Sequence, residues 1–125
     1  MLHGDDVLLT DQILACAIEV HRHLGPGLLE SIYESAICME FSAARLSFKR
    51  QIGVPLYYKG TLISEHRPDL VVEDRVIVEI KSIERLDRIH MAQMLTYLRV
   101  TELRTGLILN FNSAVLRQGI RGVIL

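Results

Sequence analysis

Apolar residues recur at helical spacing in three stretches of the chain. The first stripe predicts a helix over residues 11–23, with Thr10 as its N-cap. Gly25-Pro26-Gly27 should end this helix, because glycine suits a left-handed cap and proline cannot continue the helix. The other two stripes predict helices over residues 29–44 and 88–100.

Between the second and third predicted helices the apolar positions alternate with polar ones, a pattern typical of β-strands. Period two holds over residues 46–58, where Gly53 and Pro55 indicate a bulge or an edge strand. After a turn at Lys59-Gly60, residues 61–66 are expected to extend the same sheet. The clearest strand predictions are 69–72 and 76–81, which are rich in valine and isoleucine.

The C-terminal third adds two more strands. Residues 106–111 predict a buried strand, and because a helix precedes it, we expect a crossover that places it beside the central strands. Residues 120–125 predict a short last strand. The order of elements predicts an α/β fold in which helices flank a mixed β-sheet, with residues 1–125 forming a single domain.

Composition limits the class and cellular compartment of the protein but does not indicate a function. The net charge of −1 lacks the basic excess of strong electrostatic binders of nucleic acid, although an acidic metal site could offset basic residues elsewhere. Cys16 and Cys38 have no zinc-ligand spacing, so we expect two buried thiols in a reducing compartment. The N-terminus lacks a signal pattern and no apolar run approaches the ~20 residues of a membrane span. These features predict a soluble, cytoplasmic protein without a membrane partner.

Two acidic motifs, Arg67-Pro68-Asp69 and Glu79-Ile80-Lys81, lie in the two clearest strands. Whether their carboxylates meet depends on the connection between the strands. A two-residue turn would put Asp69 and Glu79 on opposite faces of the sheet. A three-residue loop, Glu73-Asp74-Arg75, would pair them directly, with β-carbons about 5 Å apart.

Two carboxylates at that distance repel unless a cation lies between them or one is protonated. A hard divalent cation with oxygen ligands is a natural solution, and Lys81 would add a positive charge that could assist a water nucleophile or steady a phosphate. The alternative is a solvated face with salt bridges. Against that alternative, Glu79 and Lys81 close an otherwise apolar strand, and Pro68-Asp69 opens its neighbour at the same end of the hairpin.

Other polar residues could join this site. Gln93 and Tyr97 share a face of the third predicted helix, where the amide could donate to a phosphate. Glu30, on the second predicted helix, could be a third acidic ligand. Each has a structural alternative: Gln93 and Tyr97 as residues at the edge of the core, and Glu30 as a first-turn residue favoured by the helix dipole.

The whole pattern resembles the GxxExxY family, which is placed in the PD-(D/E)xK nuclease superfamily. The resemblance covers nearly all of the chain and rests on five segments: Gly27-Leu28-Leu29-Glu30-Ser31-Ile32-Tyr33, Tyr58-Lys59-Gly60, Pro68-Asp69-Leu70 with Glu79-Ile80-Lys81, Ala92-Gln93-Met94-Leu95-Thr96-Tyr97-Leu98, and Gly106-Leu107-Ile108-Leu109-Asn110-Phe111-Asn112. It implies a restriction-endonuclease-like core of order αβββαβ, here with an extra N-terminal helix.

The resemblance also implies roles for the site residues. Asp69 and Glu79 would ligate Mg²⁺ or Mn²⁺, with Glu30 and Ile80 completing the metal set. The catalytic set would be Asp69, Glu79, Lys81, Gln93 and Tyr97. We find no departure from the motif at these positions.

The leading hypothesis from the sequence is a metal-dependent nuclease that cuts nucleic acid, with DNA as the expected partner. A second is a non-catalytic module that keeps the nuclease fold and binds nucleic acid or protein. A third is a structural domain whose acidic cluster only binds metal. A homodimer is compatible with the first hypothesis, because a compact nuclease often needs a second subunit to embrace duplex DNA.

Overall fold

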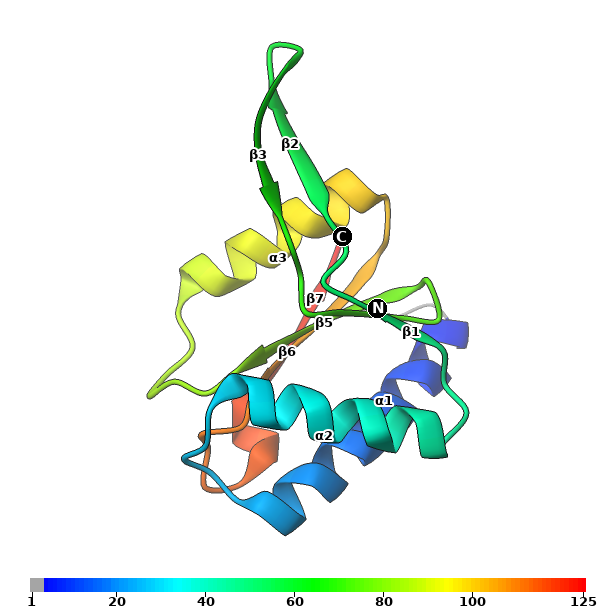
Figure 1. Cartoon of the computed structure of the whole chain (residues 1–125), viewed down its shortest axis with the longest axis vertical. Helices are drawn as coiled ribbons and strands as arrows, with labels where there is room; N and C mark the ends of the chain where they lie inside the picture. The colour runs from blue at the N-terminus through cyan, green and yellow to red at the C-terminus, as the bar shows by residue number, and fades with distance from the viewer. Residues whose placement is uncertain (1–3) are drawn as a thin grey trace.

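The helices and strands follow one another in the order α1 (Gly4–Leu24), α2 (Glu30–Ala43), β1 (Phe48–Arg50), β2 (Val54–Tyr58), β3 (Thr61–His66), β4 (Leu70–Val72), β5 (Val76–Lys81), α3 (Arg88–Thr101), β6 (Thr105–Asn110), the 3₁₀ turn η1 (Leu116–Gly119) and β7 (Ile120–Ile124). The computed structural model describes residues 4–125 (Figure 1). Residues 1–3, which bear on the predicted lack of a signal pattern, lie outside the described residues.

The main sheet has five strands in the order β1-β4-β5-β6-β7. β5 and β6 run parallel and are joined by α3, whereas the other neighbours are antiparallel. Leaving out β2 and β3, the run α2-β1-β4-β5-α3-β6 reproduces the predicted αβββαβ order, and α1 is the extra N-terminal helix. The predicted fold class is confirmed, and so is the crossover between β5 and β6.

Helices cover both faces of the sheet: α1 and α2 lie on one face and α3 on the other (Figure 1). Side chains of β5 alternate between the two cores. Val78 and Ile80 pack among residues of α1 and α2, and Ile77 packs among residues of α3. Because Ile77, Glu79 and Lys81 share one face of β5, the acidic motif faces the α3 side.

The alternating stretch over residues 46–58 forms two strands, β1 and β2, which belong to different sheets. Gln51 takes a left-handed φ of +54° and turns the chain out of the main sheet. The prediction that residues 61–66 extend the same sheet is wrong, since β3 pairs with β2 alone in a separate two-stranded hairpin. The predicted turn at Lys59-Gly60 is confirmed, and both residues have positive φ, as a tight hairpin requires.

The first helix extends further toward the N-terminus than predicted, so Thr10 lies within it and is not its N-cap. Tertiary contacts hold this added part: Leu9 packs in the core, and the Asp6 carboxylate accepts a 2.8 Å hydrogen bond from the Thr105 hydroxyl. Gly25, with φ of +67°, ends α1 as predicted.

The packed layer of α1 and α2 includes Cys16 and Cys38, which are free and buried. Burial raises the pKa of each thiol, which keeps both protonated near neutral pH. This agrees with the predicted pair of buried thiols.

In the described part of the chain, no helix is both long and apolar enough to cross a membrane.

Candidate active site

The connection between β4 and β5 sets the register of the two acidic motifs. Val72 pairs with Val76, which leaves the three residues Glu73, Asp74 and Arg75 in the loop. Leu70 pairs with Val78, so the next position out places Asp69 opposite Glu79. The three-residue alternative is therefore confirmed, and both carboxylates lie on the same face of the sheet.

Main-chain amides hold both carboxylates. The amide of Asp69 donates to Glu79 Oε1 at 2.7 Å, and the amide of Ile80 donates to Asp69 Oδ2 at 2.7 Å. Each carboxylate thus continues the hydrogen bonding of the two strands past the end of their ladder. This exchange fixes the two acidic groups side by side on rigid backbone.

Burial makes this acidic pair costly to ionise. Only 8% of Glu79 is exposed, and Asp69 is half-buried. Desolvation, then repulsion from Asp69, raises the pKa of Glu79 to about 7, although the nearby Lys81 charge acts in the opposite direction. Desolvation also raises the pKa of Asp69. A bound cation would relieve both costs, as expected of a cation site.

Ile80 can contribute to this site only through its main chain, because its side chain is fully buried on the face covered by α1 and α2. Its amide points to Asp69, and in a β-strand the carbonyl of a residue faces the same side as its amide. The carbonyl oxygen of Ile80 is therefore directed toward the edge of β5 on which Asp69 lies.

Glu30 lies at the rim of the site. It is exposed at the first position of α2, and Oε2 accepts a 3.0 Å hydrogen bond from the amide of Ser82, just after Lys81. The Ser82 hydroxyl in turn donates to the carbonyl of Leu28, which ties the start of α2 to the end of β5. The negative charge of Glu30 contributes to the raised pKa of Glu79.

Lys81 and Gln93 line a common cavity of about 480 Å³ between the end of β5 and α3. His90 lines it too, and its Nδ1 accepts a 2.9 Å hydrogen bond from the amide of Asp87, so this ring also serves the start of α3. Lys81 forms no ion pair within 4 Å with any residue that the structure describes. Its ammonium group remains available to a ligand.

Tyr97 is buried at the base of the site, with 4% of its surface exposed. Desolvation and the charges of Glu79 and Asp69 raise the pKa of its hydroxyl to about 12, so the proton stays in place at any physiological pH. Its ring lies 6.1 Å from that of His66, at the base of the β2–β3 hairpin. The structure thus gathers Asp69, Glu79 and Tyr97 within electrostatic reach of one another.

Two neighbours of Asp69 were not predicted from the sequence. The side-chain nitrogen Nε2 of Gln51 donates to Asp69 Oδ1 and to Glu34 Oε1, each at 3.3 Å, and so bridges the two carboxylates. Glu34 is buried and also pairs with Arg50 at 2.8 Å. Its charge contributes to the raised pKa of Asp69. Glu34 lies one turn after Glu30 on α2, and that i, i+4 spacing was a signal that could have identified it.

The donor set determines which cation could fit. Among the described residues, no three His, Cys, Asp or Glu side chains converge closely enough to hold a metal ion. Asp69 and Glu79 offer two carboxylates, and Ile80 offers a carbonyl oxygen. Mg²⁺ keeps several waters and binds through one or two carboxylates together with substrate phosphates, so this sparse oxygen set fits Mg²⁺ or Mn²⁺.

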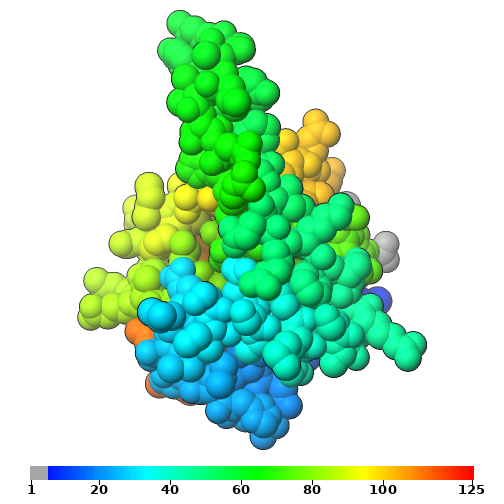
Figure 2. Space-filling model, viewed as in Figure 1, coloured from blue at the N-terminus to red at the C-terminus, as the bar shows by residue number. Residues whose placement is uncertain are grey.

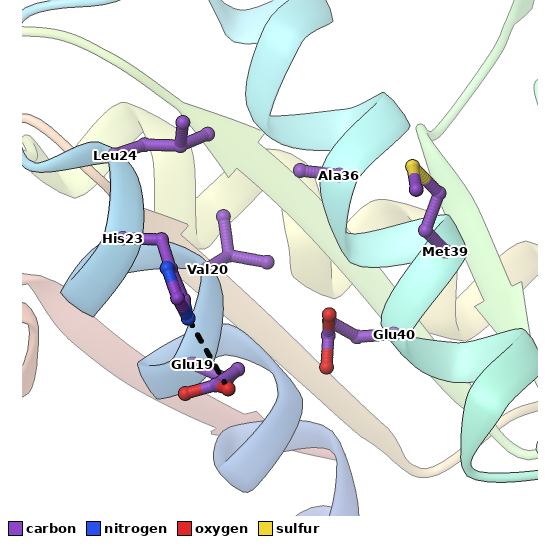
Figure 3. A pocket seen from close by; sticks show the side chains of 7 residues that line it. All are labelled: Glu19, Val20, His23, Leu24, Ala36, Met39 and Glu40. Carbon is purple, nitrogen blue, oxygen red and sulfur yellow. Dashed lines mark ion pairs between the residues drawn. The ribbon is translucent and has the colours of Figure 1, made fainter.

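A second cavity, of about 150 Å³, lies between α1 and α2 (Figure 3). Its walls include Val20 and Ala36, and at its edge His23 pairs with Glu19 at 3.4 Å. This groove belongs to the helix layer on the other side of the sheet from α3. It is separate from the acidic pair.

Comparison with known proteins identifies the class that this fold and site define. A family model described as the PD-(D/E)XK nuclease superfamily matches residues 7–123, and the chain belongs to that superfamily. The chain contains the residue pattern spelled in that name, as Pro68-Asp69 and Glu79-Ile80-Lys81. Members of the superfamily are generally divalent-metal-dependent nucleases, which links the chain to nucleic acid. A search of curated proteins gives no match, and neither does a search of solved structures.

Proposed function

We propose that this chain is a metal-dependent nuclease that hydrolyses phosphodiester bonds, with DNA as its substrate. The observation that carries the proposal is the pairing of half-buried Asp69 with buried Glu79 beside the unpaired ammonium of Lys81. Two adjacent carboxylates that are withdrawn from water, and whose pKa values are both raised, are costly to keep ionised and gain most from a cation. A salt-bridged, solvated face would not bury them.

Asp69, Glu79 and the carbonyl of Ile80 would hold Mg²⁺ or Mn²⁺, with Glu30 at the rim. When bound, the cation would offset the charge of phosphate oxygens and make a nearby water more acidic. The need for an ionised Glu79 means that cation binding should strengthen as the pH rises through about 7.

The chain's own groups would orient the reacting atoms. Lys81 would steady the developing charge on a phosphate oxygen or help the attacking water to lose a proton. Gln93, in the same cavity, would donate its amide to a phosphate oxygen. Tyr97 would keep its hydroxyl proton and offer a neutral donor beneath the carboxylates.

We also propose that the chain belongs to the GxxExxY branch and acts in the cytoplasm as a homodimer. The Gly27-x-x-Glu30-x-x-Tyr33 segment supports the branch, and in the structure it has a physical purpose. The Tyr33 hydroxyl donates to the carbonyl of Gly25 at 2.5 Å and accepts from the amide of Leu28 at 3.1 Å. These bonds fix the turn that presents Glu30 to Ser82.

A cleavage assay tests the proposed function. Wild type would be incubated with Mg²⁺ or Mn²⁺ and labelled single-stranded DNA, duplex DNA or RNA, beside Asp69→Asn and Lys81→Met. We expect cleavage by wild type, its loss in EDTA, and at least a ~100-fold lower rate in each variant. Lys49→Met, a change in an exposed lysine on β1, is the matched control and should cleave like wild type.

Cleavage that persists in both site variants would refute the assignment of the site. Binding without cleavage of any substrate by wild type would instead favour the second hypothesis, a non-catalytic module that retains the nuclease fold.

A further inference from the structure

The β2–β3 hairpin, residues 54–66, projects from the body of the molecule (Figure 1). We call it the arm. Its two strands pair with each other and with no other strand in the described chain, and the turn Lys59-Gly60 forms its tip. In Figure 2 the outer part of the arm stands clear of the rest of the molecule.

The arm carries large apolar side chains in water. Tyr57 and Ile63 are 65% and 64% exposed, Tyr58 is 63% exposed and Leu62 is 53% exposed. A two-stranded hairpin has no core of its own, so exposing this surface has a cost that a binding partner would remove.

The exposed residues lie on both faces of the arm. Tyr57 is paired with Leu62 on one face, and Tyr58 is paired with Thr61 on the other, because successive side chains alternate. The register shift next to Leu56 leaves Ile63 out of the pairing. A partner that covers both faces must surround the ribbon, as the walls of a groove do.

The base of the arm is part of the candidate active site. Val54 is buried in the core beneath α3, and the His66 ring packs against Tyr97. The chain leaves β3 through Arg67 and Pro68 and enters Asp69 directly. At ~3.3 Å per residue, the arm extends up to about 30 Å from Asp69. Because the base of the arm adjoins the site, a polymer held there would pass close to the arm.

The tip combines a cation with an aromatic ring. Lys59 Nζ lies 5.4 Å from the centre of the Tyr58 ring. At the base, Arg67 is paired with Glu65 at 2.7 Å, which neutralises both charges and leaves Lys59 as the charge at the far end. An ammonium group beside a ring suits a phosphate next to a base.

From these observations we propose that the arm binds duplex DNA, lying in the major groove next to the cleaved phosphodiester. The major groove admits a two-stranded β-ribbon, and its walls would cover both exposed faces. Tyr57 and Leu62 would contact base edges and thymine methyl groups, and Lys59 would contact a phosphate. A single strand would cover only one face of the ribbon. This inference rests on the proposed function, because it takes the polymer at the site to be DNA.

A binding assay tests the arm independently of cleavage. Fluorescence anisotropy would follow a labelled 20-base-pair duplex in EDTA, where no cleavage interferes. We expect Tyr57→Ala/Leu62→Ala to bind at least about tenfold more weakly. Lys59→Ala should lower the slope of log affinity against log salt by about one. Met39→Ser, at a residue of α2 that is 72% exposed, is the control for a generic loss of surface apolarity and should bind like wild type.

Melting temperatures and sedimentation would be measured for the same variants. Melting temperatures within a few degrees of wild type would show that the body of the protein remains folded. Arm variants that bind duplex DNA as tightly as wild type would overturn the proposal, as would a wild type that binds no duplex. A loss of dimer with unchanged DNA binding by the resulting monomer would also overturn it, in favour of contact between copies. If wild type binds DNA through the arm but never cuts, the arm proposal stands and the proposed nuclease activity fails.

Discussion

At the scale of single residues, Glu79 shows most clearly how the site works. Its carboxylate is held by the amide of Asp69 and nearly excluded from water, so its negative charge is poorly compensated. In the folded protein the pKa is raised to about 7 by desolvation and by Asp69, against an ordinary value of 4.5. Folding therefore favours the protonated form, and a cation would favour the ionised one.

This has a consequence for stability. Because the pKa of Glu79 is higher in the folded state, its contribution to stability is fully present below pH 4.5 and is lost as the pH rises through about 7. We predict that Glu79→Gln, which keeps an oxygen to accept from the Asp69 amide, removes this loss. Relative to wild type, the variant should gain up to ~3 kcal/mol in free energy of unfolding between pH 4.5 and pH 8.

Urea unfolding at several pH values without divalent cation would measure this difference. Comparing wild type with the variant cancels carboxylates such as Glu73, whose pKa is lowered by Ser47 and which therefore acts in the opposite direction. A difference that does not change with pH would contradict the account of Glu79.

The sequence identified some of these residues and not others for physical reasons. Asp69, Glu79 and Lys81 could be predicted because strand alternation and an odd loop determine their shared face. Gln51 could not, because its place between Asp69 and Glu34 depends on a left-handed backbone that a glutamine seldom adopts.

At the scale of elements, the site depends on how α3 packs on the sheet. Gly106 on β6 makes room for a side chain of α3, because a Cβ built there would lie 2.4 Å from Met94 Sδ. Met94 is buried, and it is next in sequence to Gln93. Gly106 therefore leaves room for the Met94 side chain between the sheet and the helix that carries Gln93 and Tyr97.

We predict that Gly106→Ala lowers the free energy of unfolding by about 1–3 kcal/mol through overpacking. The same change combined with Met94→Ala should cost less than the sum of the two single changes, because the shortened side chain makes room for the new methyl group. Chemical denaturation of all four proteins would measure the coupling. Strict additivity would show that the two side chains do not compete for space.

The arm shows where prediction of elements failed. The alternation in residues 46–58 does indicate strands, but a local period of two does not specify which strand is the neighbour. That choice is made where Gln51 turns the chain, and by the turn at Lys59-Gly60, which closes the hairpin on itself. For the β4–β5 hairpin the sequence left two loop lengths open, because strands that are apolar on both faces do not fix the register by their pattern, and the structure selects the three-residue loop.

At the scale of the whole molecule, the sheet separates two tasks. The larger core lies beneath α1 and α2, whereas the acidic pair, Lys81 and the residues of α3 lie on the other face. The buried strands β5 and β6 are common to both cores. The fold thus supplies a rigid support for carboxylates that are costly to bury. The mixed sheet could be predicted from the sequence, because a helix between two neighbouring strands requires a crossover connection.

The central claim is that Asp69 and Glu79 form one divalent-cation site, and calorimetric titration of Mn²⁺ into the protein at pH 8 tests it most directly. At that pH, above the pKa of about 7, Glu79 is ionised. We predict binding by wild type that is lost in Asp69→Asn and in Glu79→Gln, but is kept in the control Glu19→Gln, whose carboxylate lines the groove between α1 and α2. Equal Mn²⁺ binding by wild type and both site variants, or no binding by wild type, would contradict the claim.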